Sequence, residues 1–190
     1  MSGPSILVTG GLDGIGLEIC NDFAPASMGI SRRNGYDLDK AEDHRRIVDL
    51  SLKYDIFLNH AHNGRFAGQT ELLYEVFEAW EKAGKFGYIF STGSFATYMP
   101  QGDFKRYSVL KRALEIANQQ CCKKIESAGL PFRMTLIKPG MLDTQASREK
   151  PHWSGNGVRG RDIAELIRFF YNGPKDLLMN EVVISAILPS

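Results

Sequence analysis

Three side chains have types and spacing that suit acid–base chemistry: Ser94, Tyr107 and Lys111. Tyr107 and Lys111 are four positions apart, so on a helix they share one face. A free phenol has a pKa of about 10, and a nearby ammonium group lowers that pKa because it favours the phenolate. Such a phenol can donate a proton to a carbonyl oxygen at neutral pH, or accept one from an alcohol. Ser94 can hydrogen-bond the same oxygen and stabilise its developing charge.

A Tyr-x-x-x-Lys pair alone also arises by chance on an ordinary helix with a packing Tyr and a solvated Lys. The segment "VTGGLDGIG" (8–16) supports the chemical interpretation. It directly follows a strand-like run and precedes a helix-like one, which is the context of a dinucleotide-binding turn. Glycines at positions 10, 14 and 16 allow the main chain to approach a ligand. The amides of the next helix offer donors to a pyrophosphate.

Short apolar runs alternate with segments of helical period along the whole chain. Strands are expected at 5–8, 26–30, 55–59, 87–91, 132–137 and 182–187, and helices at 17–23, 39–53, 70–83, 105–127 and 162–171. Apolar strands separated by helices predict a parallel sheet covered on both faces. The prediction is a single α/β domain over residues 1–190, a doubly wound parallel sheet in a Rossmann-type three-layer arrangement. The polar segment 143–160 is expected to be a mobile substrate loop.

Composition excludes several classes of protein. Lys and Arg number 23 against 22 Asp and Glu, a net charge of +1 that gives no support to nucleic-acid binding. No apolar run is long enough to span a bilayer, and the N-terminus lacks a signal-peptide layout. Three cysteines without metal-ligand spacing indicate free, buried or half-buried thiols. We therefore expect a cytoplasmic protein with no nucleic-acid or membrane partner.

Taken together, the motifs resemble those of the short-chain dehydrogenases/reductases. "TGGLDGIG" (9–16) is similar to that family's cofactor turn, and "DIFLNHAH" (55–62) to its Asn-containing strand end. Ser94 and Tyr107 have the family's spacing of thirteen, and "KPGMLDT" (138–144) matches the segment beside the nicotinamide. "GRDIAELIRFF" and "MNEVVIS" are similar to its closing helix and last strand. The five motifs occur in the family's order from about Ser5 onwards.

The resemblance implies a nicotinamide dinucleotide, a small carbonyl/alcohol substrate, hydride transfer with Tyr as acid/base, and a homodimer or homotetramer. It also implies that Lys111 holds the nicotinamide ribose. The expected cofactor-binding residues are Gly10, Leu12, Asp13, Gly14, Ile15, Gly16, Ser31, Arg32, Arg33, Asp37, Leu38, Asn59, Ala61, Tyr107, Lys111, Pro139, Gly140, Met141 and Thr144.

The chain departs from the family in its middle. It is short, and the usual third strand is reduced to "GYDLD" (35–39). The helix after Asn59 lacks the asparagine that often holds a proton-relay water, so that role passes to a backbone-held water or is absent. His60 and His62 stand where Asn and Gly are usual. Two histidines on one strand end invite a metal, but no third ligand is evident, and we expect them to line the cofactor cleft without a metal.

The end of the second strand bears on the choice of cofactor. "ISRRN" has Ser31 where an acidic residue would bind the ribose of NAD, followed by Arg32 and Arg33, which suit the 2′-phosphate of NADP. Asp13 in the glycine turn argues the other way, because its carboxylate repels that phosphate. NADP(H) is favoured over NAD(H). Asp37 and Leu38 are expected at the adenine, with Asp49 and Leu50 as the rival pair.

Two functions remain open. The first is an NADP(H)-dependent carbonyl/alcohol oxidoreductase acting on a ketone, hydroxy acid, sugar nucleotide, pterin or acyl thioester. Arg148, Lys150 and Arg159 in the loop hint at an anionic substrate or are merely solvated. The second is a dinucleotide-binding regulator without turnover, which the shortened middle of the chain makes plausible. The complete Ser94, Tyr107 and Lys111 set argues for the enzyme.

Overall fold

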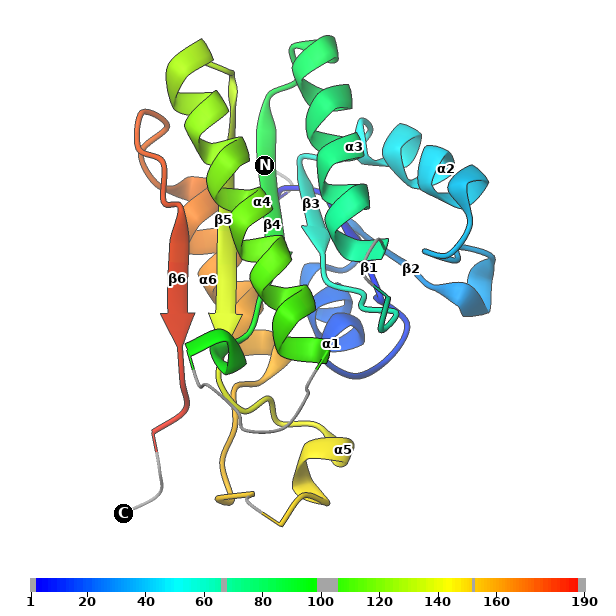
Figure 1. Ribbon diagram of the computed structural model, residues 1–190, viewed down its shortest axis with the longest axis vertical. Coiled ribbons are helices and arrows are strands. Elements are labelled where there is room, and N and C mark those ends of the chain that lie inside the picture. The colour runs from blue at the N-terminus through cyan, green and yellow to red at the C-terminus, as the bar shows by residue number, and fades with distance from the viewer. Residues whose placement is uncertain (1–2, 66–67, 99–105, 152, 188–190) are drawn as a thin grey trace.

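The computed structural model describes residues 3–65, 68–98, 106–151 and 153–187. Six parallel strands form one sheet in the order β2-β1-β3-β4-β5-β6 (Figure 1). The strands are β1 (Ile6–Thr9), β2 (Ser27–Ile30), β3 (Ile56–Asn59), β4 (Gly87–Thr92), β5 (Phe132–Pro139) and β6 (Glu181–Ile184). The α-helices are α1 (Gly14–Phe23), α2 (Ala41–Ser51), α3 (Gly68–Ala83), α4 (Arg106–Ala128), α5 (Gln145–Arg148) and α6 (Gly160–Asn172), and the short 3-10 turns are η1 (Arg32–Asn34) and η2 (Phe95–Tyr98).

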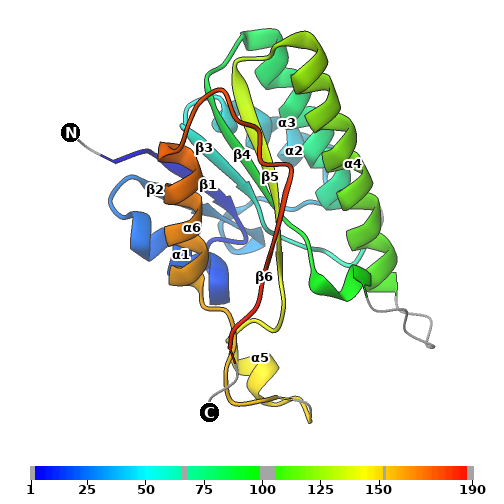
Figure 2. The same ribbon diagram turned by 90° about the vertical axis from the view of Figure 1, so that its left-hand side faces the viewer.

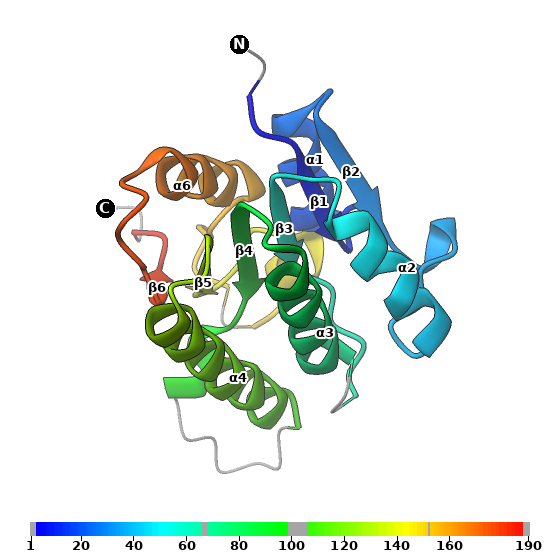
Figure 3. The same cartoon turned by 90° about the horizontal axis from the view of Figure 1, so that it is seen from above.

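Helices cover both faces of the sheet, as predicted for a Rossmann-type arrangement. Helices α1 and α6 lie on one face, and α2, α3 and α4 lie on the other (Figure 3). Alternate residues of a strand serve the two cores: Ile6 and Val8 pack with α1 and α6, whereas Leu7 packs with α2, α3 and α4. Because both faces of the central strands are buried, these strands read as continuous apolar runs in the sequence.

The order of the strands reverses between β1 and β3. From β1 the chain crosses to β2 on one side, and the next strand, β3, pairs with the other side of β1. The helices on either side of this point diverge, which opens a crevice at the carboxyl ends of the strands. The glycine turn after β1 and the segment after β3 meet there, so the topology brings two of the predicted motifs to one place.

The reduced third strand expected at 35–39 does not form, so this prediction is wrong. Gly35 ends η1 with a left-handed φ of 85°, and the segment continues as irregular chain into α2. Side chains of α2 satisfy its backbone: Arg46 donates to the Gly35 carbonyl at 2.9 Å, and the Asp43 carboxylate accepts from the Asp37 amide at 3.0 Å. With these bonds made locally the segment joins no ladder, and β2 is left at the edge of the sheet.

The other elements lie where the sequence places them, with shifted ends. Helix α1 begins at Gly14 inside the glycine turn, three residues before the predicted start, and the predicted first residue of the 105–127 helix lies outside the described ranges. The three cysteines are free and buried. No helix in the described part of the chain is long and apolar enough to cross a bilayer.

The polar segment 143–160 contains α5 and lies beyond the carboxyl ends of β5 and β6 (Figure 2). An isolated bridge pairs Leu142 with Val158 and closes the base of this loop. Residue 152 lies outside the described ranges. The mobility of the loop stays a prediction.

Candidate active site

A cavity of about 380 Å³ lies at the carboxyl ends of the central strands. It runs from the loop after β2, past the glycine turn and the end of β3, to the start of α4. Eleven predicted site residues line it: Gly10, Ser31, Arg32, Asp37, Leu38, Ala61, Ser94, Tyr107, Lys111, Pro139 and Gly140. One space therefore joins the expected adenosine end of a dinucleotide to the three candidate catalytic residues.

The remaining predicted residues divide into two groups. Asp13, Gly14, Ile15 and Thr144 line an adjoining depression between the glycine turn and the loop 143–160, and His60 and Leu142 line both spaces. Leu12, Gly16, Arg33, Asn59 and Met141 line neither. Asn59 is fully buried, where its side-chain amide donates to the Gln69 carbonyl at 2.9 Å.

The glycine turn needs its glycines for two different reasons. Gly10 has a φ of 73°, in the left-handed region that favours glycine. Gly16 packs so closely that an added Cβ would lie 2.2 Å from the Gly10 carbonyl oxygen. Helix α1 can therefore begin directly against the end of β1. Gly14 and Ile15 of its first turn line the adjoining depression, and the Gly14 amide donates to the Asp13 carboxylate at 2.8 Å.

Lys111 is almost completely enclosed, with 3% of its surface exposed. Its ammonium group donates to the Thr92 carbonyl at 2.7 Å and to the Gln69 side-chain oxygen at 2.8 Å. Burial disfavours the charged form and lowers the pKa of Lys111 to about 7. The lysine is thus a fixed group whose proton is poised near neutrality in the ligand-free protein.

Tyr107 stands one turn earlier on α4 and is 42% exposed. The Lys111 ammonium lies 5.8 Å from the centre of its ring, and the ring of His62 meets it edge-on at 5.2 Å. Ser94 lies just past β4, where its hydroxyl oxygen accepts from the Ala96 amide at 3.1 Å. Ser94, Tyr107 and Lys111 thus line the same cavity. Residues 99–105, which connect η2 to α4, lie outside the described ranges.

The two histidines line the cavity, as expected, but make different contacts. His60 Nδ1 is 3.1 Å from the Thr92 hydroxyl, and burial together with the Lys111 charge lowers the pKa of His60 to about 4. The same causes lower the pKa of His62, whose ring packs against Tyr107. His60 is therefore neutral at neutral pH. Within the described ranges, no three His, Cys, Asp or Glu side chains are grouped so as to hold a metal ion.

Arg32 and Arg33, which follow β2 at the end of the cavity expected to hold adenosine, make different contacts. Arg32 lines the cavity, whereas Arg33 turns away and pairs with Asp13 at 2.9 Å. The carboxylate of Asp13 also accepts from the Gly14 amide at 2.8 Å and caps α1. Sequence reasoning set Asp13 and Arg33 against each other as opposing charges toward a phosphate. In the structure each charge is largely balanced by the other.

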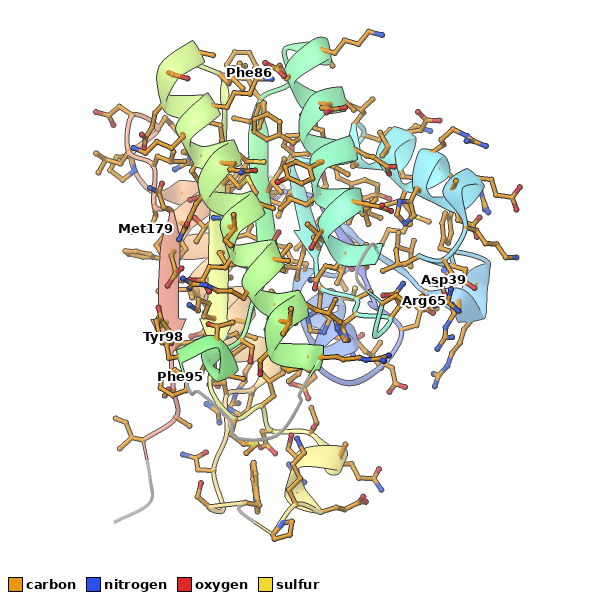
Figure 4. All side chains as sticks on the ribbon, viewed as in Figure 1. Asp39, Arg65, Phe86, Phe95, Tyr98 and Met179 are labelled. Atoms are coloured by element: carbon orange, nitrogen blue, oxygen red, sulfur yellow. The ribbon has the colours of Figure 1, made fainter. Side chains whose placement is uncertain are left out.

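Of the two pairs expected at an adenine, Asp37 and Leu38 line the cavity. The rival pair, Asp49 and Leu50, lies on α2 outside it. Nearby, Arg65 approaches Asp39 at 3.3 Å (Figure 4). This contact links the segment after β3 to the segment before α2 beside the same end of the cavity.

Two of the loop cations that hinted at an anionic substrate are engaged elsewhere. Arg148 pairs with Asp143 at 2.7 Å, and Arg159 pairs with Asp162 at 2.7 Å. These partners hold the pKa of Asp143 and of Asp162 below the ordinary value. The two arginines therefore give no specific support to an anionic substrate.

Sequence reasoning missed Gln69, the second residue of α3. A search of this helix for asparagine passes over it, and nothing in the local pattern marks it. Its partner Lys111 is 42 positions away in the chain, so only the folded structure brings the two side chains together.

Comparison with known proteins gives structural matches only. No family model matches the sequence, and no curated protein matches it. A 3-ketoacyl-(acyl-carrier-protein) reductase from Brucella melitensis, solved with NADH, superposes with a TM-score of 0.74 at 16% identity, covering 96% of this chain and 97% of that one. An alcohol dehydrogenase from the archaeon Thermococcus sibiricus, solved with 5-hydroxy-NADP, gives 0.71 at 18% identity, covering 98% of both chains. A short-chain type dehydrogenase/reductase from Mycobacterium marinum gives 0.76 at 16% identity, covering 96% and 94%.

The chain has the short-chain dehydrogenase/reductase fold. The likeness extends over nearly the whole chain, so the loss of the strand at 35–39 leaves the architecture intact. Within this fold the cavity lies at the point where the strand order reverses, which is where open α/β sheets bind their ligands.

Proposed function

We propose that this protein is an oxidoreductase that interconverts a carbonyl and an alcohol with a nicotinamide dinucleotide, preferring NADP(H). One observation carries the proposal: a single cavity is lined by Gly10 of the glycine turn, by Arg32 and by the candidate residues Ser94, Tyr107 and Lys111. Proteins of the same fold have been solved with NADH and with 5-hydroxy-NADP, which supports a dinucleotide here.

The residues present fit such a cofactor. At the turn where the pyrophosphate would approach the start of α1, Gly10 has a left-handed φ and Gly16 leaves no room for a Cβ. Asp37 and Leu38 would contact the adenine, and Arg32 would contact the 2′-phosphate. Lys111 would hold the nicotinamide ribose. When bound, the nicotinamide supplies or accepts the hydride.

The protein's own part in the reaction is proton transfer. In the reducing direction the Tyr107 hydroxyl gives its proton to the carbonyl oxygen as hydride reaches the carbonyl carbon, and the product is the alcohol. Ser94 donates a hydrogen bond to that oxygen and stabilises its developing negative charge. The positive charge of Lys111 favours the phenolate that Tyr107 becomes. The oxidising direction reverses each of these transfers.

The test is NADPH consumption with the carbonyl classes that remain open: ketones, keto acids, oxidised pterins, sugar nucleotides with a keto group and 3-ketoacyl thioesters. We expect oxidation of NADPH with at least one of them. Tyr107→Phe should lower turnover by a factor on the order of a hundred or more, while the dissociation constant for NADPH stays near that of the wild type. The matched control is Tyr74→Phe, because the Tyr74 hydroxyl donates to Gln120 outside the cavity.

Two results would contradict the proposal. Near-normal turnover in Tyr107→Phe would remove the tyrosine from the acid role. Binding of NADPH without oxidation by any of the carbonyl classes would favour the regulator without turnover.

A homodimer or homotetramer in the cytoplasm is part of the same proposal. Val109 and Ile116 on α4 are large apolar residues with 55% and 47% of their surface exposed. These two residues are seven positions apart, so they lie on the same face of α4 and suit contact with a second copy. Light scattering on the purified protein should give a multiple of the 21.2 kDa chain mass.

A further inference from the structure

The side chain of Gln69 is buried between the ends of two strands, with 5% of the residue exposed. Its amide nitrogen donates to the Asn59 carbonyl at 2.7 Å and to the Thr92 carbonyl at 3.3 Å. In return, the Asn59 side chain donates to the Gln69 carbonyl at 2.9 Å. These bonds fix which way the amide points, since a flipped amide would face two carbonyl oxygens with its own oxygen.

The fixed amide presents its oxygen to the Lys111 ammonium group at 2.8 Å. The second acceptor of that ammonium is the Thr92 carbonyl, which is also neutral. Among the described residues, no carboxylate lies within 4 Å of the Lys111 nitrogen, and both of its hydrogen bonds go to neutral acceptors. The titratable groups that face it are Tyr107 from its own helix and His60 and His62 from the segment after β3. Its charge is therefore not cancelled by any of these neighbours.

The amide of Gln69 has an advantage over the two other kinds of side chain that could stand at position 69, an apolar one and a carboxylate. An apolar side chain at position 69 would leave an ammonium donor buried without an acceptor, which is costly. A carboxylate would form a buried ion pair and cancel most of the field that Lys111 exerts on its surroundings. The Gln69 amide is a neutral acceptor, and its own hydrogen bonds fix its position. It therefore neither leaves the ammonium group without an acceptor nor cancels its charge.

We propose that Gln69 is a positioning residue for Lys111: its neutral amide holds the ammonium group at the cavity and leaves the charge available to Tyr107. The role of that charge in catalysis rests on the proposed function. The hold on the ammonium group does not, and it can be measured without a substrate.

The principal experiment is a titration of Lys111 by NMR in the folded, ligand-free protein labelled with ¹³C and ¹⁵N lysine. The signal of Lys111 is assigned by its loss in Lys111→Met. In the wild type it should titrate at about pH 7. In Gln69→Glu the new carboxylate should raise the pKa of Lys111 by about two units or more. The matched control is Gln120→Glu, the same change at an exposed position of α4, which should leave the titration unaltered.

A second variant keeps the test decisive if Gln69→Glu does not fold. Below pH 6 the hydrogen-bonded ammonium of Lys111 should exchange its protons slowly in the wild type, and Gln69→Ala should accelerate that exchange at least about tenfold. In turnover assays, Gln69→Glu should lower kcat about tenfold or more and displace its pH profile, with less than about a threefold change in the dissociation constant for NADPH. A residue that only fills space would move neither the titration nor the pH profile.

The possible outcomes separate this inference from the proposed function. If folded Gln69→Glu titrates Lys111 at the same pH as the wild type, or Gln69→Ala keeps slow exchange, the inference is wrong even in an active enzyme. The pKa of Lys111 could instead move as expected while the protein fails to oxidise NADPH with any of the carbonyl compounds. In that case Gln69 does hold Lys111 and the proposed function is wrong.

Discussion

The two ends of the cavity handle charge in opposite ways. At the inner end, Lys111 and Gln69 have 3% and 5% of their surface exposed, and the ammonium group relies on two neutral acceptors. The outer end is the one expected to hold adenosine. Beside it, and outside the cavity lining, the side chains of Arg33 and Asp13 are 69% and 77% exposed and form an ordinary ion pair. Water screens the exposed pair, so it contributes at most about 1 kcal/mol. Because Lys111 is buried, the loss of either of its hydrogen bonds would leave a donor without water or protein as a partner, which would destabilise the fold.

This difference in burial predicts that the inner end mainly affects turnover and that the outer end mainly affects the affinity for the cofactor. A buried cation with fixed acceptors keeps its position, so it can stabilise negative charge that develops on a group beside it during the reaction. An exposed arginine contributes to binding through contacts that salt weakens and neighbours can compete for. Substitutions at the inner end should therefore change turnover by large factors, and substitutions at the outer end should change cofactor affinity by small ones.

The largest effect is expected from Lys111→Met, which removes the charge beside Tyr107 and keeps the apolar stem. Turnover should fall by about three orders of magnitude, because the negative charge proposed to develop on Tyr107 loses the positive charge nearest to it. Stopped-flow measurement of NADPH oxidation gives the rate. Lys124→Met is the matched control, since Lys124 is on the same helix and pairs with Glu81 away from the cavity. A loss of less than about tenfold would contradict the assignment.

The same variant should respond differently to pH when it unfolds. Burial lowers the pKa of Lys111 from 10.5 to about 7, so between these values the unfolded chain binds a proton that the folded protein has lost. The free energy of unfolding of the wild type should therefore rise with pH across this window, by at most about 1.4 kcal/mol per unit from this group. Lys111→Met should lack that rise. Urea unfolding at several pH values from 6 to 10 would measure the difference.

The sequence predicted parts of both ends of the cavity, and the parts that it missed have physical reasons. Tyr107 and Lys111 are four residues apart on one helix, so local periodicity alone places them together. The central strands were predictable because burial on both faces leaves apolar runs. The segment 35–39 was not, because its backbone partners are the side chains of Asp43 and Arg46, which only the packing of α2 brings near. The Asp13–Arg33 pair likewise joins residues 20 positions apart.

At the outer end, Arg32→Ala should have the larger effect. Arg32 lines the cavity, and the proposed contact of its guanidinium with the 2′-phosphate is worth about tenfold in the dissociation constant for NADPH. The constant for NADH should change by less than about twofold, since that cofactor lacks the phosphate. Fluorescence titration with both cofactors provides the measurement, with Arg45→Ala on the exposed side of α2 as the control. Equal weakening of both cofactors would place Arg32 elsewhere in the binding mode.

The smallest effect, and the one that tests the comparison most directly, is expected from Asp13→Asn. Asparagine caps a helix as well as aspartate does, so α1 should keep its start and the stability of the fold should change little. The substitution removes the partner of Arg33 and frees a second guanidinium near the cavity. NADPH should bind about two to five times more tightly, and the gain should vanish at high salt because the site is exposed. In Asp13→Asn combined with Arg33→Ala the gain should disappear at every salt concentration. If it persists there, the carboxylate acts on the phosphate directly, and the charge balance between Asp13 and Arg33 does not govern the outer end.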